Sequence, residues 1–203
     1  MDEQNYRYDE IAEKVFYPIF DVIAENIITT TGITRGRMLD IGSGGGHLGF
    51  AMMKRTELSC VFADIEPVAL KIAERRAAEL GMSERCSTSI QDVHTMNLPD
   101  CYADLIVSRG SMIFWEDQEK AFSEIYRVLA PGGMTYVGTG CGSAECLKQI
   151  NAKHPDGPDW LRRIREKSKT LTTEEYRRTF NRLGYEHLII EGDGIGRWIL
   201  LKK

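Results

Sequence analysis

A short apolar run followed by a cluster of glycines constrains this chain more than any other feature. Met38 to Ile41 has the length and character of a buried parallel strand, and it stops at the run Gly42-Ser43-Gly44-Gly45-Gly46. Glycines reach positive φ and let a ligand approach main-chain N–H groups. A helix that opens near His47 would point the positive end of its dipole at the same place. The sequence therefore predicts a ligand-binding loop here.

A second apolar run, Cys60 to Ala63, ends in an acidic residue, Asp64. Asp64 follows Gly44 by roughly 20 residues, and an acid at that distance, at the tip of a second strand, is placed to accept hydrogen bonds from a ribose diol. The unit of strand, glycine loop, helix, strand and acid predicts a site for a cofactor that contains a nucleoside.

The glycine register and Asp40 bear on which cofactor this is. A dinucleotide fingerprint counted from Gly42 would need a glycine where the chain has His47, although a shifted match exists at residues 44, 46 and 49. An NAD(P)-linked oxidoreductase therefore stays open as an alternative. Asp40 favours another class, because a carboxylate inside an apolar strand is costly unless paired. It would repel a pyrophosphate and attract an ammonium or a sulfonium.

The segment from Met38 to Gly46 resembles the first motif of class I S-adenosylmethionine-dependent methyltransferases. The resemblance continues in order over about residues 33 to 140. Val61 to Pro67 is similar to the second motif, and further similar segments are Ser89 to Val93 (the adenine-binding loop), Ala103 to Ser108 (the fourth strand) and Arg127 to Gly133 (the turn before the fifth). The resemblance implies an α/β, Rossmann-like fold: a seven-stranded, mostly parallel sheet with an antiparallel C-terminal strand and helices on both faces.

The resemblance also implies S-adenosyl-L-methionine as the cofactor and suggests which residues hold it. Asp40 and the glycine loop would hold the methionine moiety, Asp64 the ribose diol and Asp92 the adenine amine. Val93 could sandwich the adenine with Leu98, or both could pack the loop on its own scaffold. The candidate cofactor-binding residues are Asp40, Gly42, Ser43, Gly44, Gly46, Asp64, Ile65, Asp92, Val93 and Ser108.

Catalytic candidates follow the fourth strand, where open α/β sheets bind their ligands. Arg109 could hold the carboxylate of a substrate or brace the loop by bonding backbone carbonyls, and Ser111 lies nearby. Tyr8 is a third candidate, together with Tyr6, because an N-terminal flap covers the sulfonium in many relatives of this family. The catalytic residue stays unassigned, because displacement on an activated methyl needs mainly alignment and desolvation.

The predicted reaction is methyl transfer to a small-molecule acceptor. The loop after the fourth strand lacks the Asn/Asp-Pro-Pro-aromatic signature of adenine and amide methylases, and no cysteine has the setting of the cytosine-C5 nucleophile. The formal net charge of −4 gives no attraction to nucleic acid. A non-catalytic S-adenosylmethionine-binding regulatory protein stays an alternative. The sequence does not indicate the acceptor atom or the oligomeric state.

Composition agrees with one soluble globular domain of 203 residues, with 42% hydrophobic and 28% charged residues. Five scattered cysteines form no disulfide framework, and the pair Cys141 and Cys146 lacks the partners of a metal site. No apolar run approaches membrane-spanning length. We therefore expect a cytoplasmic protein with no metal and no membrane partner.

The expected domain, residues 1–203, has four parts: a helical cap (1–32), a cofactor-binding core (33–140), a variable cap (141–171), and a helix with a hairpin (172–203). Two N-terminal helices, or one helix kinked at Pro18, are expected. A capping box at Thr172 opens a helix that ends at Gly184. The basic run in 160–169 favours a solvated helix face; a basic cap over an acidic substrate is the alternative.

Overall fold

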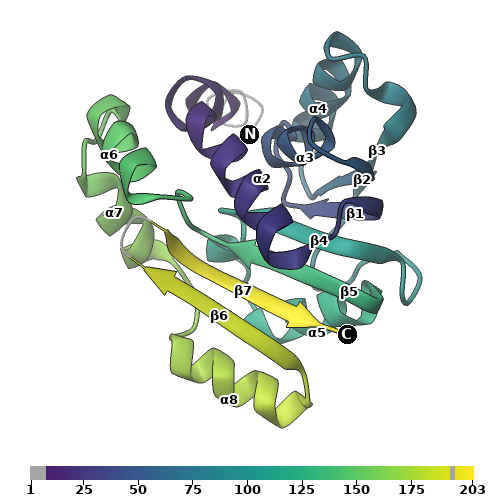
Figure 1. The fold of residues 1–203 in the computed structure, drawn as a ribbon. Coiled ribbons are helices and arrows are strands. Elements are labelled where there is room, and N and C mark those ends of the chain that lie inside the picture. The colour runs from purple at the N-terminus through teal and green to yellow at the C-terminus, as the bar shows by residue number, and fades with distance from the viewer. Residues whose placement is uncertain (1–7, 193–194) are drawn as a thin grey trace.

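The structure, a computed structural model, describes residues 8–192 and 195–203. The predictions on Tyr6 and on the turn at residues 193–194 lie outside the described residues. The described chain builds a seven-stranded sheet in the order β3-β2-β1-β4-β5-β7-β6 (Figure 1). The strands are β1 Arg35–Ile41, β2 Glu57–Asp64, β3 Cys86–Ile90, β4 Ala103–Arg109, β5 Leu129–Gly138, β6 Glu186–Gly192 and β7 Gly196–Lys202.

Strand directions confirm the predicted fold class. Strands β1 to β5 pair in parallel with their neighbours, whereas β7 lies between β5 and β6 and is antiparallel to both. The predicted C-terminal hairpin is therefore confirmed, with β6 and β7 paired from Glu186 and Lys202 to Gly192 and Gly196. The antiparallel strand joins the sheet through this hairpin rather than through a crossover helix.

Helices cover both faces of the sheet (Figure 1). They are α2 Tyr17–Thr31, α3 His47–Met53, α4 Pro67–Glu79, α5 Gln118–Val128, α6 Ala144–Lys153, α7 Asp159–Lys167 and α8 Thr173–Leu183, with shorter turns η1 Ala12–Phe16, η2 Ser83–Arg85 and η3 Met112–Phe114. Successive strand residues point to opposite faces. In β1, Met38 accordingly packs in one buried cluster with α2 and α3, and Leu39 in another with α5 and α8.

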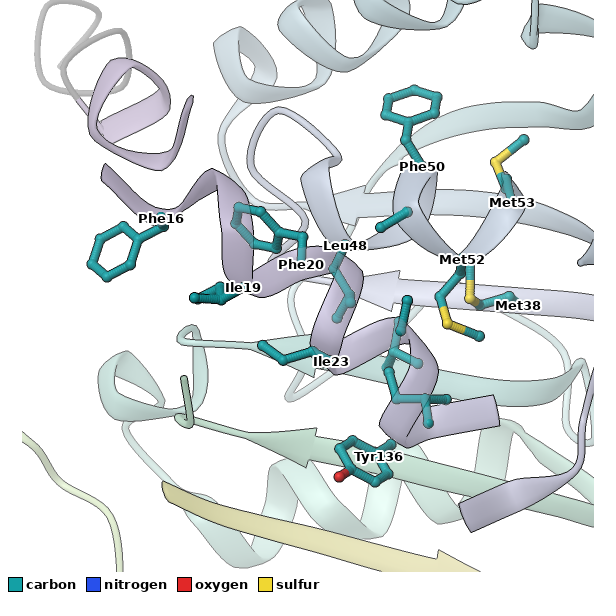
Figure 2. Close-up of a cluster of buried hydrophobic side chains, with 14 of the residues drawn as sticks. Phe16, Ile19, Phe20, Ile23, Met38, Leu48, Phe50, Met52, Met53 and Tyr136 are labelled. Atoms are coloured by element: carbon teal, nitrogen blue, oxygen red, sulfur yellow. The ribbon is translucent and has the colours of Figure 1, made fainter. Parts of the chain in front are cut away.

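The first of these clusters joins the N-terminal helix α2 to α3, the helix that follows the glycine loop. Figure 2 shows Ile23 of α2, Leu48 of α3, Met38 of β1 and Tyr136 of β5 gathered in it. Ile23 and Met38 have no exposed surface, and Leu48 and Tyr136 are nearly as buried. Burial of this kind contributes roughly 25 cal/mol per Å² of apolar surface, so α2 is a core element as well as a cap.

The N-terminal segment is one helical stretch rather than two helices. Residues 8–11 are helical, η1 is a π-helical turn, and α2 follows without a break. Pro18 stands in the first turn of α2. Proline has no N–H and its ring crowds the carbonyl four residues earlier, so a widened turn just before it accommodates both effects. The expected irregularity at Pro18 is present as this π-turn.

The helix caps largely agree with the sequence, but β5 begins earlier than expected. Thr172 and Glu175 form the predicted capping box, and Gly184 is the left-handed C-cap of α8. The predicted fifth strand starts at Met134, whereas Leu129 already pairs with β4 before the register shifts. The turn expected at Gly132 and Gly133 is therefore an irregularity inside β5. No helix within the described ranges has the length and apolar character needed to cross a bilayer.

Candidate functional site

A cavity of about 1390 Å³ opens at the carboxyl ends of the parallel strands. One side of it carries the glycine loop after β1, the end of β2 and the loop after β3. The other side is formed by residues of the N-terminal helical segment, by the loop after β4, and by α6 and α7, which lie beside this edge of the sheet (Figure 1). Ligand sites occur at this position in open α/β sheets.

Backbone hydrogen bonds fold the glycine loop over the end of β2. The N–H groups of Gly42 and Ser43 both donate to the carbonyl of Ala63, at 2.8 and 3.1 Å. Gly42 has φ +61°, and a Cβ there would lie 2.3 Å from the Cβ of Ser111. Glycine at this position is therefore required both by the backbone conformation and by the close approach of the loop after β4.

Asp40 lies at the base of this loop and is only 2% exposed. Its Oδ2 accepts a hydrogen bond of 3.0 Å from the backbone N–H of Gly49 in α3. Burial raises the pKa of Asp40 to about 7. The hydrogen bond from Gly49 favours the ionised form and so opposes this rise, but burial has the larger effect. Asp40 also lines the cavity. A ligand cation next to it would supply the charge partner that stabilises the carboxylate.

Asp64 connects the end of β2 to the glycine loop and to the start of α4. Its carboxylate accepts from the N–H of Gly44 at 2.8 Å and from the N–H of Glu66 at 3.0 Å. Burial raises the pKa of Asp64, opposed by these backbone hydrogen bonds. Each carboxylate oxygen has two acceptor sites, so the same group can still accept from ligand hydroxyls.

Asp92 is held by His94 two residues later. The backbone N–H of His94 bonds Asp92 Oδ1 at 2.9 Å and lowers the pKa of Asp92, and the ring Nδ1 lies 2.7 Å from the same oxygen. Nε2 of His94 accepts from the N–H of Asp117, the N-cap of α5. The His94 side chain is only 18% exposed because it joins this loop to α5.

Ile65 and Val93 lie on the walls of the cavity between Asp64 and Asp92. Val93 is buried, whereas Ile65 is 61% exposed, so its side chain is open to a ligand in the cavity. Leu98 does not line the cavity; it packs against the buried cluster under α5. The apolar pair that could flank a planar ring is therefore Ile65 with Val93.

Two predicted cofactor residues do not line the cavity. Ser108 is fully buried, and its Oγ lies 2.6 Å from Oγ of Ser111, which also donates to the carbonyl of Ile41 at 3.3 Å. Gly46 is turned toward the aromatic rings of Phe50 and Phe62, which lie within 3.0 Å of where its Cβ would be. The other eight candidates line the cavity: Asp40, Gly42, Ser43, Gly44, Asp64, Ile65, Asp92 and Val93.

The three catalytic candidates, Tyr8, Arg109 and Ser111, all line the cavity. Tyr8 is 54% exposed in the N-terminal segment. The Arg109 guanidinium lies over the ring of Phe16 at 4.4 Å, and Nε donates to the carbonyl of Gly140 at 3.3 Å. Burial lowers the pKa of Arg109, with the Cys141 thiol opposing this. The hydroxyl of Ser111 is engaged with Ser108 of β4 and with the carbonyl of Ile41 in β1.

Sequence reasoning missed a polar cluster that ties the N-terminal segment to the glycine loop. Asp9 Oδ1 lies 2.9 Å from Nε2 of His47, and Asp9 Oδ2 lies 3.1 Å from Nη2 of Arg76. Arg76 also donates to the carbonyl of Gly45. Burial alone would raise the pKa of Asp9, but hydrogen bonds from His47 and Arg76 hold it at about 2. These residues are far apart in the sequence, and no spacing pattern connects them.

The basic run at residues 160–169, most of which lies on α7, has its described charges paired on the surface. Arg162 pairs with Glu166, Arg163 with Asp156, and Lys169 with Glu116. The apolar residues of the same helix, Trp160, Leu161 and Ile164, line the cavity. The contacts therefore agree with the solvated-face interpretation.

Comparisons with known proteins were consistent with this geometry. The sequence model of a family described as "Methyltransferase domain" matches residues 38–133. A crystal structure from Methanococcus maripaludis, provisionally assigned as an S-adenosyl-L-methionine-dependent methyltransferase, is 39% identical, with a TM-score of 0.91. The match covers 100% of this chain and 93% of that one.

Curated relatives match over a shorter range. The uncharacterised methyltransferase YdaC of Bacillus subtilis is 35% identical over 109 residues, which is 52% of this chain and 58% of that protein. The demethylmenaquinone methyltransferase of Thermus thermophilus is 35% identical over 102 residues, 50% of this chain and 46% of that protein. The chain thus spans about half the length of the curated relatives it matches.

Proposed function

Because this chain belongs to the S-adenosylmethionine-dependent methyltransferases, we propose that it transfers the methyl group of S-adenosyl-L-methionine to a small-molecule acceptor. The observation that carries the proposal is that one cavity joins a polar side, containing Asp40, Asp64 and Asp92, to an apolar side beside Arg109. The polar side suits the cofactor and the apolar side suits the acceptor. Methyltransferases of small molecules among the relatives, such as the demethylmenaquinone enzyme, support this class of acceptor.

On the cofactor side, each proposed contact uses a group of the matching chemistry. Asp40 offers a buried carboxyl to the cationic methionine end, where an ammonium or sulfonium would stabilise its ionised form. Asp64 offers acceptor sites to the ribose diol beside the glycine loop. Asp92 would accept from the adenine amine, with the adenine ring between Ile65 and Val93, which would cover the exposed surface of Ile65.

The proposed reaction is an in-line displacement. The acceptor nucleophile forms a bond to the methyl carbon as the bond from carbon to the sulfonium sulfur breaks, and the sulfur keeps that electron pair as a thioether. A cavity that holds both reactants in line, with solvent excluded, supplies most of the acceleration. Ser111 is not proposed as a base, because its hydroxyl bonds Ser108 and the Ile41 carbonyl.

The proposal is tested with S-adenosyl-L-methionine carrying a labelled methyl group. We expect label to move to low-molecular-weight acceptors in a protein-free cell extract, and Asp64→Ala to slow this transfer about 30-fold or more at limiting cofactor. Calorimetric titration with S-adenosylhomocysteine should show one site per chain. Binding without any transfer would favour the non-catalytic alternative, and absence of binding would overturn the proposal.

A further inference from the structure

Arg109 is a cation placed inside the acceptor side of the cavity. It is the last residue of β4, and its guanidinium lies 4.4 Å from the ring centroid of Phe16 and 5.9 Å from that of Phe20. Both rings belong to the N-terminal helical segment, which Asp9 also ties to the glycine loop through His47 and Arg76. The two aromatic faces hold the guanidinium in one orientation, since cation–π contacts favour a cation over the ring face.

The guanidinium has no carboxylate partner in the described part of the chain. Its polar protein contacts are the Gly140 carbonyl and the Cys141 thiol. The other cation on this side of the cavity, Arg197, is paired with Glu191 and donates to the Leu171 carbonyl. A partly buried, always-charged group without a counter-ion is costly, and the planar fork of donors on Arg matches an oxyanion with two hydrogen bonds.

Much of the cavity wall on the side of Arg109 is apolar. Phe16, Leu147, Trp160, Leu161 and Ile164 line the same part of the cavity. A neighbouring pocket of about 500 Å³ shares an apolar wall with it, formed by Ile113, Phe114, Trp160 and Ile164. The charged residues of that second pocket, Arg163 and Asp156, pair with each other. Phe114 is 66% exposed, so this wall is available to a ligand. A cation with no carboxylate partner among the described residues, beside a long apolar wall, fits a molecule with an oxyanion on an apolar body.

We propose that Arg109 anchors the acceptor and that the acceptor is an organic oxyanion with an apolar body. This inference rests on the proposed function, because it assigns the acceptor side of the same cavity. Arg109 is thus a specificity residue that binds the acceptor, rather than a brace for the loop after β4. The carboxylates of Asp40, Asp64 and Asp92 would repel such an anion from the cofactor side, which gives the two ligands different ends of one cavity.

Two fluorescent probes with the same apolar body separate these roles. 1-Anilinonaphthalene-8-sulfonate carries a sulfonate oxyanion, and N-phenyl-1-naphthylamine is its neutral counterpart. Dissociation constants of both are measured by fluorescence titration in the presence of saturating S-adenosylhomocysteine. We expect Arg109→Gln to weaken sulfonate binding about tenfold or more, the size of a lost charge-assisted hydrogen bond, and to change binding of the neutral probe less than about twofold.

Two further variants make the comparison independent of folding defects. Arg109→Lys keeps the charge without the planar fork, and should recover part of the selectivity. Arg162→Gln removes the same charge from an exposed site on α7, and should leave the ratio of the two dissociation constants unchanged. Because each ratio is measured on one variant, a general loss of cavity structure cancels from it.

The proposal is overturned if the sulfonate does not bind the wild type, or if Arg109→Gln changes both dissociation constants by the same factor. The latter would show that Arg109 only braces the loop through Gly140 and the Phe16 ring. Failure of the proposed function is visible separately, since S-adenosylhomocysteine would then not bind in calorimetry. The ratio of the two probes' dissociation constants, measured without S-adenosylhomocysteine, would still report on Arg109.

Discussion

Protonation of Asp40 links cofactor binding to pH at the scale of one residue. In the unliganded protein burial holds its pKa at about 7, so below that pH the carboxyl is mostly neutral. An adjacent ligand ammonium favours the carboxylate, and binding therefore releases a proton. Affinity for S-adenosylhomocysteine should rise as pH increases from about 5.5 to 7.5. Below the pKa of Asp40, each pH unit should change the affinity by at most about tenfold.

Calorimetry in two buffers of different ionisation enthalpy measures this proton release directly. Asp40→Asn keeps an oxygen for the Gly49 N–H, and should flatten the pH dependence. An affinity that falls with rising pH, or an equal dependence in Asp40→Asn, would show that another group titrates.

Asp64 should affect both cofactor affinity and folding. It accepts hydrogen bonds from the Gly44 and Glu66 N–H groups, so Asp64→Ala should lower the free energy of unfolding by about 1–3 kcal/mol. Loss of the ribose contacts should weaken cofactor binding by roughly 2 kcal/mol or more. Denaturant unfolding beside calorimetric titration separates the two effects, and full affinity in a destabilised Asp64→Ala would exclude the ribose role.

At the scale of elements, the Asp9 cluster should control how firmly the N-terminal segment closes on the glycine loop. The pKa of Asp9 in the folded protein, about 2, lies below its ordinary value of 3.8. Its stabilising contribution is therefore present above about pH 4 and is lost as pH falls through 2. Asp9→Asn removes the charge and should loosen residues 8–16 at neutral pH.

Hydrogen exchange measured peptide by peptide tests this prediction. In Asp9→Asn, amides of residues 8–16 should exchange at least several-fold faster, while those of β1 and β4 stay protected. Glu10→Gln is a matched control, because Glu10 pairs with Lys14 on the exposed side of the same helical turn. Equal exchange in both variants would mean that apolar packing alone holds the segment.

How far the sequence predicts the structure differs between these elements. The strand at Met38–Ile41, the acid at Asp64 and the C-terminal hairpin follow from local patterns, since apolar period, turn residues and caps act over a few neighbours. In the Asp9 cluster, His47 lies 38 positions and Arg76 67 positions from Asp9 in the sequence, and only the assembled fold brings them together. The early start of β5 escaped prediction because its glycines indicate a turn, while pairing of Leu129 with Ala103 overrides that local preference.

For the whole molecule, cofactor binding should appear as added stability. A ligand that binds only the folded chain stabilises it by about 2.7 kcal/mol at 100 times its dissociation constant, roughly 5–10 °C in Tm for a domain of this size. S-adenosylhomocysteine should produce this shift and NADH should not, measured by scanning calorimetry. A comparable shift with NADH would mean that the cavity accepts dinucleotides.

The place of β7 between β5 and β6 has a consequence for synthesis on the ribosome. Strands β1 to β5 and the helices up to α8 are all synthesised before residues 196–202. Until then the outer edge of β5 has no partner strand, and β6 has nothing to pair with. Unpaired edges invite association with other chains. The nascent chain therefore passes through an interval in which it is most exposed to misassembly, and insertion of this single strand ends it.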